Sequence, residues 1–154
     1  WIRKRHTLLK GSTWKNRKWL FFDTYLEMVA GKEGKIPALF PQVWLYYDPK
    51  LQKDRIKKIF EHQRMDFLML FSESQRVVIE IDGVQHYAEY VEGNKKHYAS
   101  VDKYADMMAA QREMSLAGYD VYRFGAKELY NPAIGKRKMC AFFDGLFSKY
   151  GISV

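Results

Sequence analysis

The chain of 154 residues has little of the chemistry that metal–thiolate sites require. It holds one cysteine, Cys140, which excludes an internal disulfide and any Cys-rich zinc motif. Its four histidines, His6, His62, His86 and His97, lack the i, i+4 spacing of two ligands on one helix. The sequence contains neither a G-x-x-x-x-G-K-[ST] phosphate loop nor a G-x-S-x-G nucleophile elbow. These absences exclude Cys-rich zinc proteins, P-loop nucleotide hydrolases and serine hydrolases of the elbow type.

Long hydrophobic runs are absent as well. The longest uncharged run, from Ile36 to Tyr47, is twelve residues long and includes two prolines. A membrane-spanning helix needs about 20 consecutive apolar residues, so we expect no membrane partner. The single cysteine fits a reducing compartment, and we expect a cytoplasmic location. With 47% hydrophobic and 16% aromatic residues, the whole chain, residues 1–154, is expected to fold as one domain with a sizeable core.

Acidic residues are missing from the start of the chain. Seven basic residues precede the first acid, Asp23, and these are Arg3, Lys4, Arg5, Lys10, Lys15, Arg17 and Lys18. Residues 1–60 hold fourteen Lys or Arg against five acids, whereas residues 61–154 hold twelve against thirteen, so the surplus behind the net charge of +8 is N-terminal. Such a segment suits DNA, with RNA as an alternative, because phosphate contacts supply most of the non-specific affinity. The other interpretation is a solvated tail. Because the chain opens on Trp1, we expect part of a larger polypeptide, with residues 1–11 as a basic linker.

Three acidic residues stand among strand-forming residues, namely Asp66, Glu80 and Asp82. The β-branched run Val77–Ile81 predicts a largely buried strand, and alternation places the last two acids on one face. The run Met65–Phe71 predicts a second strand, which carries the first acid. The polar sequence SESQR between the two runs predicts a hairpin turn. The sequence therefore predicts an antiparallel hairpin with acids on both strands.

The register of this hairpin decides which acids meet. Paired positions of an antiparallel hairpin have a constant sum, which is 146 if Asp66 faces Glu80 and 148 if it faces Asp82. Either register centres the turn near Glu73 and Ser74, within the polar sequence. Both registers therefore bring the three acids together.

A cluster of three carboxylates needs compensation. Two carboxylates about 4 Å apart repel by roughly 4 kcal/mol at an effective dielectric constant near 20, and burial adds a further cost. The compensation can come from raised pKa values, from buried arginines, or from a hard divalent cation. Because all candidate ligands are oxygen donors, the pattern favours Mg²⁺ or Mn²⁺ over zinc. The alternative is a surface strand whose acids simply face solvent.

The remaining elements predict an α/β fold with a mixed sheet. A strand, a helix and a second strand in succession imply a crossover, so the two strands are expected to be parallel. The expected elements are a helix from Ser12 ended by Gly31, a strand at 41–47, a helix at 51–62, a loop at 89–100, a helix at 101–117 ended by Gly118, a strand at 119–124 and a helix at 132–150.

Two segments together resemble a known nuclease family. The sequence EIDGVQHY (80–87), a helix containing Arg112, and LAGYDVYRFGAKEL (116–129) follow Asp66 in an order similar to the PD-(D/E)XK nuclease superfamily, and most closely to very-short-patch-repair-like bacterial endonucleases. The resemblance covers residues 64–129. It implies a restriction-endonuclease-like core, in which a central mixed β-sheet is flanked by helices, and a bacterial defence or repair role. It also implies that Asp66 and Glu80 hold the metal.

The chain departs from the family pattern at two positions. The lysine that gives the superfamily its name would occupy position 82, where this chain has Asp82. The resemblance also implies a lysine directly before the glutamine, but this chain has Val84 at that position. Asp82 is then expected to assist Asp66 and Glu80 as a third metal ligand. Gln85 is the nearest polar group that can orient the attacking water.

Several other residues are candidates to touch nucleic acid. Positive charge toward the phosphate would come from Lys103 or Arg112. Further contacts are expected from Arg64, His86, Lys95 and Lys96, the two lysines lying in the expected loop. His86 is placed to face the metal, the phosphate or the core. Arg123 alternates with apolar neighbours, so it should face the polar side of the sheet, where it pairs with a site acid or touches nucleic acid.

These observations lead to three functional hypotheses. The first is a metal-dependent endonuclease that hydrolyses DNA phosphodiester bonds. The second, motivated by Asp82 at the lysine position, is a nuclease-like module that binds nucleic acid without cutting it. The third is a protein-interaction domain of a larger polypeptide.

Overall fold

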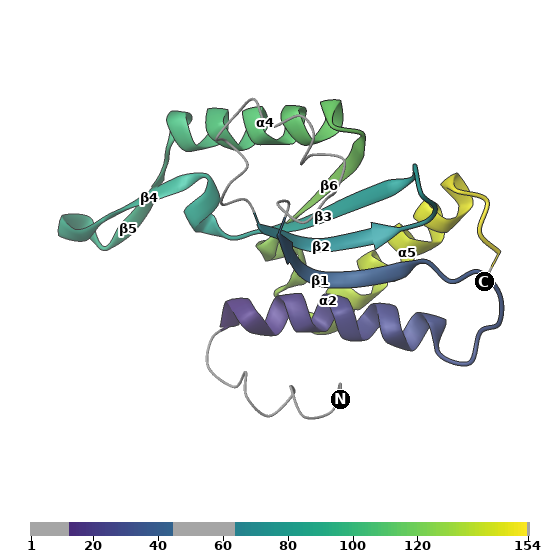
Figure 1. Cartoon of the computed structure of the whole chain (residues 1–154). Coiled ribbons are helices and arrows are strands. Elements are labelled where there is room, and N and C mark those ends of the chain that lie inside the picture. Colours follow the sequence, from purple (N-terminus) through teal and green to yellow (C-terminus); the bar gives the residue numbers. More distant parts are fainter. Residues whose placement is uncertain (1–12, 45–63, 154) are drawn as a thin grey trace. The chain divides into compact units, whose positions relative to one another are not determined.

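The computed structural model describes residues 13–44 and 64–153 (Figure 1). The expected basic linker 1–11 and the expected helix 51–62 lie outside these residues, as does the end of the strand expected at 41–47. The described chain forms two compact units, which are treated separately below. One is the sheet unit, Pro37–Phe124, and the other is the helical unit, which comprises the residues up to Ile36 and those from Gly125 onward. None of the described helices is long and apolar enough to span a membrane.

The sheet unit is built on a four-stranded mixed sheet, as the sequence predicted. Its strands lie in the order β1-β2-β3-β6. Their bounds are Ala38–Trp44 for β1, Arg64–Leu70 for β2, Arg76–Asp82 for β3 and Tyr119–Gly125 for β6. The pairs β1–β2 and β2–β3 are antiparallel. Because the sheet also contains parallel pairing, β3 and β6 form the parallel pair, which confirms the predicted crossover.

A serine-rich turn joins β2 to β3. The hydroxyl oxygen of Ser72 accepts hydrogen bonds from the amides of Ser74 and Gln75, at 3.3 and 3.1 Å. The amide of Phe71 donates to the carbonyl oxygen of Gln75 at 3.0 Å and closes the loop. A serine side chain here replaces backbone partners in a tight turn. The hairpin predicted from the SESQR sequence is thus confirmed.

The crossover helix α4, Val101–Leu116, lies along one face of this sheet (Figure 1). Its inward residue Met114 is buried with Met65, Val78 and Tyr119. The hydroxyl of Ser100 caps the helix by accepting from the amide of Lys103 at 3.4 Å. The helix ends before Gly118, which has the left-handed φ of 89° that glycine adopts without a Cβ clash. Since Glu80 and Asp82 alternate with buried Ile81, they share the face of Val78, which α4 covers.

The segment that follows β3 corrects one prediction. Residues 89–100, expected to be a loop, contain most of a second, two-stranded antiparallel sheet. Its strands are β4, Ala88–Val91, and β5, Lys96–Ala99, joined by the short helix η5, Glu92–Asn94. This β4–β5 hairpin extends away from the four-stranded sheet in Figure 1, and all residues of β5 are exposed.

The base of the β4–β5 hairpin is tied to the start of α4. The Lys103 ammonium donates to the carbonyl oxygen of Ala88 at 2.8 Å. The Ser100 amide donates to the carbonyl oxygen of Tyr87 at 2.9 Å, and the Ser100 hydroxyl donates to a carboxylate oxygen of Glu89 at 3.1 Å. These three bonds hold the base of the hairpin against the start of α4.

The helical unit packs two long helices around aromatic side chains. Helix α2 spans Thr13–Val29 and α5 spans Pro132–Lys149, preceded by the short helix η6, Ala126–Leu129. Buried Phe143 of α5 lies with its ring centroid 5.1 Å from those of both Phe21 and Tyr25 of α2. The exposed Glu27 of α2 is paired with Lys136 of α5.

Alkaline pH is expected to weaken this helical unit through Tyr25. Burial raises the pKa of Tyr25 to about 12. A free tyrosine has a pKa of about 10, so the folded state keeps the phenol protonated where the unfolded state has lost the proton. The resulting stability is fully present below pH 10 and is lost as the pH rises through 12. We expect the free energy of unfolding to fall by about 2 kcal/mol between about pH 9 and about pH 11.5.

The measurement is urea unfolding of the wild type and of Tyr25→Phe at both pH values. Phenylalanine cannot ionise, so the variant should lack this part of the pH dependence. Equal losses in the two proteins would show that Tyr25 does not cause the effect.

Candidate active site

The backbone pairing between β2 and β3 stops next to the acidic residues. Paired positions run from Leu70 and Arg76 to Phe67 and Ile79, and the residue numbers of every pair sum to 146. This confirms the register of 146 and excludes that of 148. At the next positions in this register, Asp66 and Glu80, hydrogen bonds between side chains and backbone amides replace the backbone pairing.

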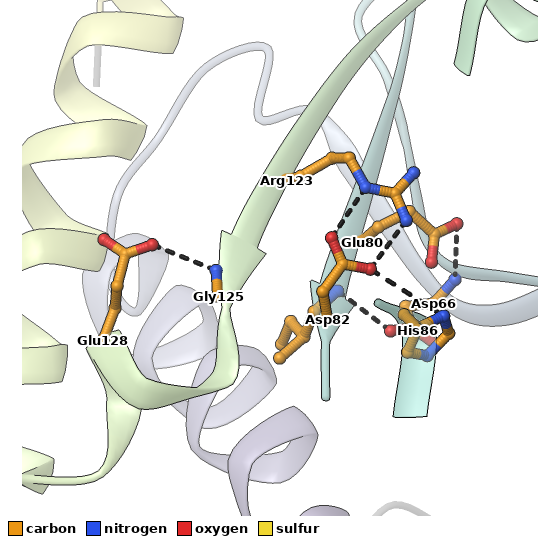
Figure 2. A network of polar contacts seen from close by, with 8 residues as sticks. Asp66, Glu80, Asp82, His86, Arg123, Gly125 and Glu128 are labelled. Carbon is orange, nitrogen blue, oxygen red and sulfur yellow. Dashed lines mark hydrogen bonds and ion pairs between the residues drawn. The ribbon is translucent and has the colours of Figure 1, made fainter. Parts of the chain in front are cut away.

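Two hydrogen bonds between side chains and backbone hold this end of the hairpin. The carboxylate Oδ2 of Asp66 accepts from the amide of Ile81 at 3.0 Å. The carboxylate Oε1 of Glu80 accepts from the amide of Asp66 at 3.4 Å. Figure 2 shows both acids at this junction. A backbone amide of each strand thus binds the carboxylate of the other strand. These bonds restrict the side-chain rotamers of Asp66 and Glu80.

The three acids are buried to a similar degree. The exposed fractions of Asp66, Glu80 and Asp82 are 5%, 8% and 8%. Buried carboxylates are costly unless they are hydrogen-bonded and balanced by positive charge. The alternative of acids on a solvent-facing strand is therefore wrong. The hairpin holds a cluster whose charge must be compensated.

Part of that compensation comes from Arg123 of β6. Its Nε donates to Oδ2 of Asp82 at 2.7 Å, and its Nη2 donates to Oδ1 at 2.6 Å (Figure 2). Burial lowers the pKa of Arg123, but hydrogen bonding and charge attraction from Asp82, with attraction from Glu80 and Asp66, outweigh it and raise the pKa above its ordinary value. The prediction that Arg123 pairs with a site acid is confirmed. A largely buried arginine, one of the three possible forms of compensation, is therefore present.

The polypeptide leaves the site through Gly83 and the short helix η4, Val84–His86. The carboxamide of Gln85 folds back over Gly83, where an added Cβ would come within 2.3 Å of Oε1 of Gln85. The Nδ1 of His86 lies 4.0 Å from Oδ1 of Asp82, and the imidazole is 41% exposed. Gln85 and His86 are therefore exposed polar groups at the margin of the acidic cluster.

The structure places the other predicted nucleic-acid contacts on β2, on the β4–β5 hairpin and on α4. Arg64 is exposed at the start of β2, with its guanidinium 5.9 Å from the ring of Trp44. Lys95, with a left-handed φ of 49°, and Lys96 lie at the turn of the β4–β5 hairpin, and both are exposed. Arg112 is exposed on α4. Lys103, bonded to the Ala88 carbonyl, already has a structural role.

The donor set fits a hard divalent cation at two of the three acids. Within residues 13–44 and 64–153, no three His, Cys, Asp or Glu side chains are arranged to hold a metal ion. Both oxygens of Asp82 accept from Arg123, so a cation at Asp82 would compete with the guanidinium. Asp66 and Glu80 are neighbours whose carboxylates accept hydrogen bonds from backbone amides of the hairpin. Mg²⁺ is usually held by one or two carboxylates plus water, which suits this pair.

Sequence reasoning missed the bidentate pair between Asp82 and Arg123. Alternation along β6 indicates the face on which the arginine lies, but not which acid it meets. The parallel pairing of β3 and β6 was the signal that could have identified the partner, because both residues lie toward the C-terminal ends of adjacent strands. No family model matches the chain, and no curated protein or solved structure matches it either.

Proposed function

We propose that this protein is a metal-dependent endonuclease that hydrolyses phosphodiester bonds of DNA, with Asp66 and Glu80 as ligands of one Mg²⁺ or Mn²⁺. The observation that carries the proposal is the junction of β2 and β3, where two buried carboxylates are fixed by backbone amides. Catalytic groups need such fixed positions, because small displacements cost rate. The resemblance of residues 64–129 to PD-(D/E)XK nucleases agrees with this assignment.

The cation and the protein side chains would have different roles in the reaction. When bound, a divalent cation lowers the pKa of a coordinated water and stabilises negative charge on the phosphate. Asp66 and Glu80 would hold it, and the exposed carboxamide of Gln85 would orient the attacking water. The water oxygen attacks phosphorus, the bond from phosphorus to one sugar oxygen breaks, and that oxygen takes up a proton. The exposed Lys95 and Lys96 would contact backbone phosphates.

A second candidate function is binding of nucleic acid without cleavage. The observation that favours it is the ion pair of Asp82 with Arg123, because the family places a lysine where Asp82 stands. In such a protein the cluster would serve only to hold β3 against β6. This candidate predicts DNA binding that weakens with salt but needs no metal.

Removing divalent metal is expected to abolish DNA nicking. Supercoiled plasmid should be nicked in Mg²⁺ or Mn²⁺ and remain intact in excess chelator, because two buried carboxylates without a cation repel the phosphate. The measurement is gel analysis of plasmid forms over time, together with calorimetric titration of Mn²⁺ into the protein. One bound Mn²⁺ is expected per chain.

The same two assays separate the candidate functions. Salt-sensitive plasmid binding with neither nicking nor Mn²⁺ binding would exclude the endonuclease and support the binding module. Absence of DNA binding at low salt would exclude both and leave a protein-interaction domain.

A further inference from the structure

One nitrogen of the Arg123 guanidinium, Nη1, is not used by Asp82. The Nε and Nη2 atoms are used by Asp82, whereas Nη1 makes no hydrogen bond to any described residue. Figure 2 shows this third nitrogen without a dashed line. The Arg123 side chain keeps an exposed fraction of 16%, so it reaches solvent. A fixed cation therefore presents unused N–H groups at the edge of the acidic cluster.

The charge of the cluster points to an anionic ligand with a cation. Three carboxylates, Asp66, Glu80 and Asp82, face one guanidinium, so the four side chains carry a formal charge of −2. All three carboxylates attract Arg123, which places it within the field of the Asp66–Glu80 pair and not only of its own partner. One divalent cation at the Asp66–Glu80 pair would bring the formal charge of these four side chains to zero. With the cation bound, the carboxylates no longer cancel the positive charge of the Arg123 guanidinium. The guanidinium can then attract a phosphate.

Lys103 and Arg112, the two cations predicted from the sequence to face the phosphate, are less suited to this role. The ammonium of Lys103 donates to the carbonyl oxygen of Ala88. Arg112 is exposed on α4 and forms no hydrogen bond or ion pair with the described residues. Among the residues that the structure describes, Arg123 is held within the cluster by two hydrogen bonds to one carboxylate.

We propose that Arg123 binds a non-bridging oxygen of the scissile phosphate through Nη1, and that Asp82 is a positioning residue which orients the guanidinium for this contact. The inference rests on the proposed endonuclease function and changes the role of Asp82 from metal ligand to support of Arg123. A guanidinium suits both tasks because its planar, permanently charged fork can bind one oxyanion on each of two edges.

The test compares Arg123→Met and Arg123→Lys with wild type in metal-dependent plasmid nicking. Methionine keeps much of the volume without charge, and kcat should fall about 100- to 1,000-fold, the usual effect of losing one donor to a transition-state oxyanion. KM should change by less than about 10-fold, because the contact strengthens as charge develops. Lysine cannot hold Asp82 by two bonds and also reach the phosphate, so kcat should still fall about 10-fold or more. Arg137→Met, at an exposed residue of α5, is the matched control and should nick like wild type.

Asp82→Asn tests the positioning role. The carboxamide keeps the shape of Asp82 but offers a single oxygen to the guanidinium, so kcat should fall less than in Arg123→Met. Combining Asp82→Asn with Arg123→Met should add little to the loss of the latter alone, because a positioning residue acts only through the group it orients. Independent, multiplicative losses would overturn this role for Asp82.

Two readouts separate catalysis from structural support. Guanidinium at low millimolar concentration should restore part of the nicking by Arg123→Ala, whereas an equal concentration of KCl should not. Calorimetric titration of Mn²⁺ into Arg123→Met should show binding at least as tight as in wild type, because a positive charge beside the ligands has been removed. A merely structural arginine would give variants that lose metal binding and thermal stability together and do not respond to guanidinium.

The outcomes also distinguish this inference from the proposed function. If wild type nicks DNA and Arg123→Met or Arg123→Lys nicks at the wild-type rate, the role of Arg123 is overturned while the endonuclease assignment stands. If wild type neither binds Mn²⁺ nor nicks DNA, both are overturned. If Arg123→Met does not fold, Arg123→Lys, which keeps the charge, decides the question.

Discussion

Glu80→Gln is expected to lower kcat for metal-dependent DNA nicking by about 1,000-fold. A bound cation contributes several kcal/mol of charge stabilisation in the transition state, and about 1.4 kcal/mol corresponds to a factor of ten in rate. Glutamine removes the charge that holds the cation but keeps an oxygen that can accept the hydrogen bond from the amide of Asp66. The loss should therefore appear in catalysis and in Mn²⁺ affinity, with little change in melting temperature. The measurements are single-turnover nicking, calorimetry and thermal unfolding.

A matched control distinguishes this loss from a general effect of charge. Glu92→Gln makes the same chemical change at an exposed residue of the β4–β5 hairpin and should leave nicking unchanged. Asp66→Asn should behave like Glu80→Gln, because asparagine keeps an acceptor for the amide of Ile81. Wild-type rates in both site variants would remove Asp66 and Glu80 from the mechanism.

Phe143→Ala is expected to destabilise the helical unit by about 4 kcal/mol, the usual cost of emptying a buried phenylalanine site. Phe143 is completely buried, and its ring lies 5.1 Å from Phe21 and Tyr25 and 6.2 Å from Phe147. Alanine leaves a cavity that three rigid aromatic side chains cannot easily fill. For a chain of this length, the corresponding fall in melting temperature is roughly 8–16 °C. Urea and thermal unfolding followed by circular dichroism measure both quantities.

The neighbouring Phe142 provides the control for this prediction. It lies on the same helix, with its ring 5.5 Å from that of Phe143, but is only partly buried. Phe142→Ala removes the same atoms from a site that solvent already reaches, so its cost should be clearly smaller. Equal losses for the two variants would contradict the position of Phe143 at the centre of this core.

The sequence allowed the β2–β3 hairpin to be predicted with little ambiguity. Alternation, the polar turn and the position of Asp66 left two registers, of 146 and 148, and the structure has the first. The helix ended by Gly118 and the parallel strand after it followed from equally strong local signals. In each case one face of the element is buried, so the hydrophobic pattern specifies it.

The β4–β5 hairpin could not be predicted in the same way. Every residue of β5 and most residues of β4 are exposed, so no apolar face produces an alternating pattern. The hairpin depends instead on backbone pairing and on bonds at its base, such as that from Lys103 to Ala88. Interactions of this kind leave only a weak signal of strand propensity, here in Tyr90, Val91 and Tyr98. A polar composition was therefore interpreted as a loop.

The sequence predicted which acids form the candidate site, but not which residues of the site pair with one another. Burial of Asp66, Glu80 and Asp82 followed from the strand pattern. The division of the cluster into an Asp66–Glu80 pair and an Asp82–Arg123 pair depends on the lateral distance between β3 and β6, which spacing along the chain does not encode. The family pattern with a lysine at position 82 gave no indication of this division.

The bond from the Ile81 amide to Asp66 also stops the strands from pairing further. Backbone pairing would continue toward Arg64 if the Asp66 carboxylate did not occupy the amide of Ile81. In a register shifted by two residues, Asp66 would instead face Asp82, whose oxygens already bind Arg123. The Asp66 carboxylate therefore specifies the strand register of the hairpin, a role separate from the metal ligation that we propose for it.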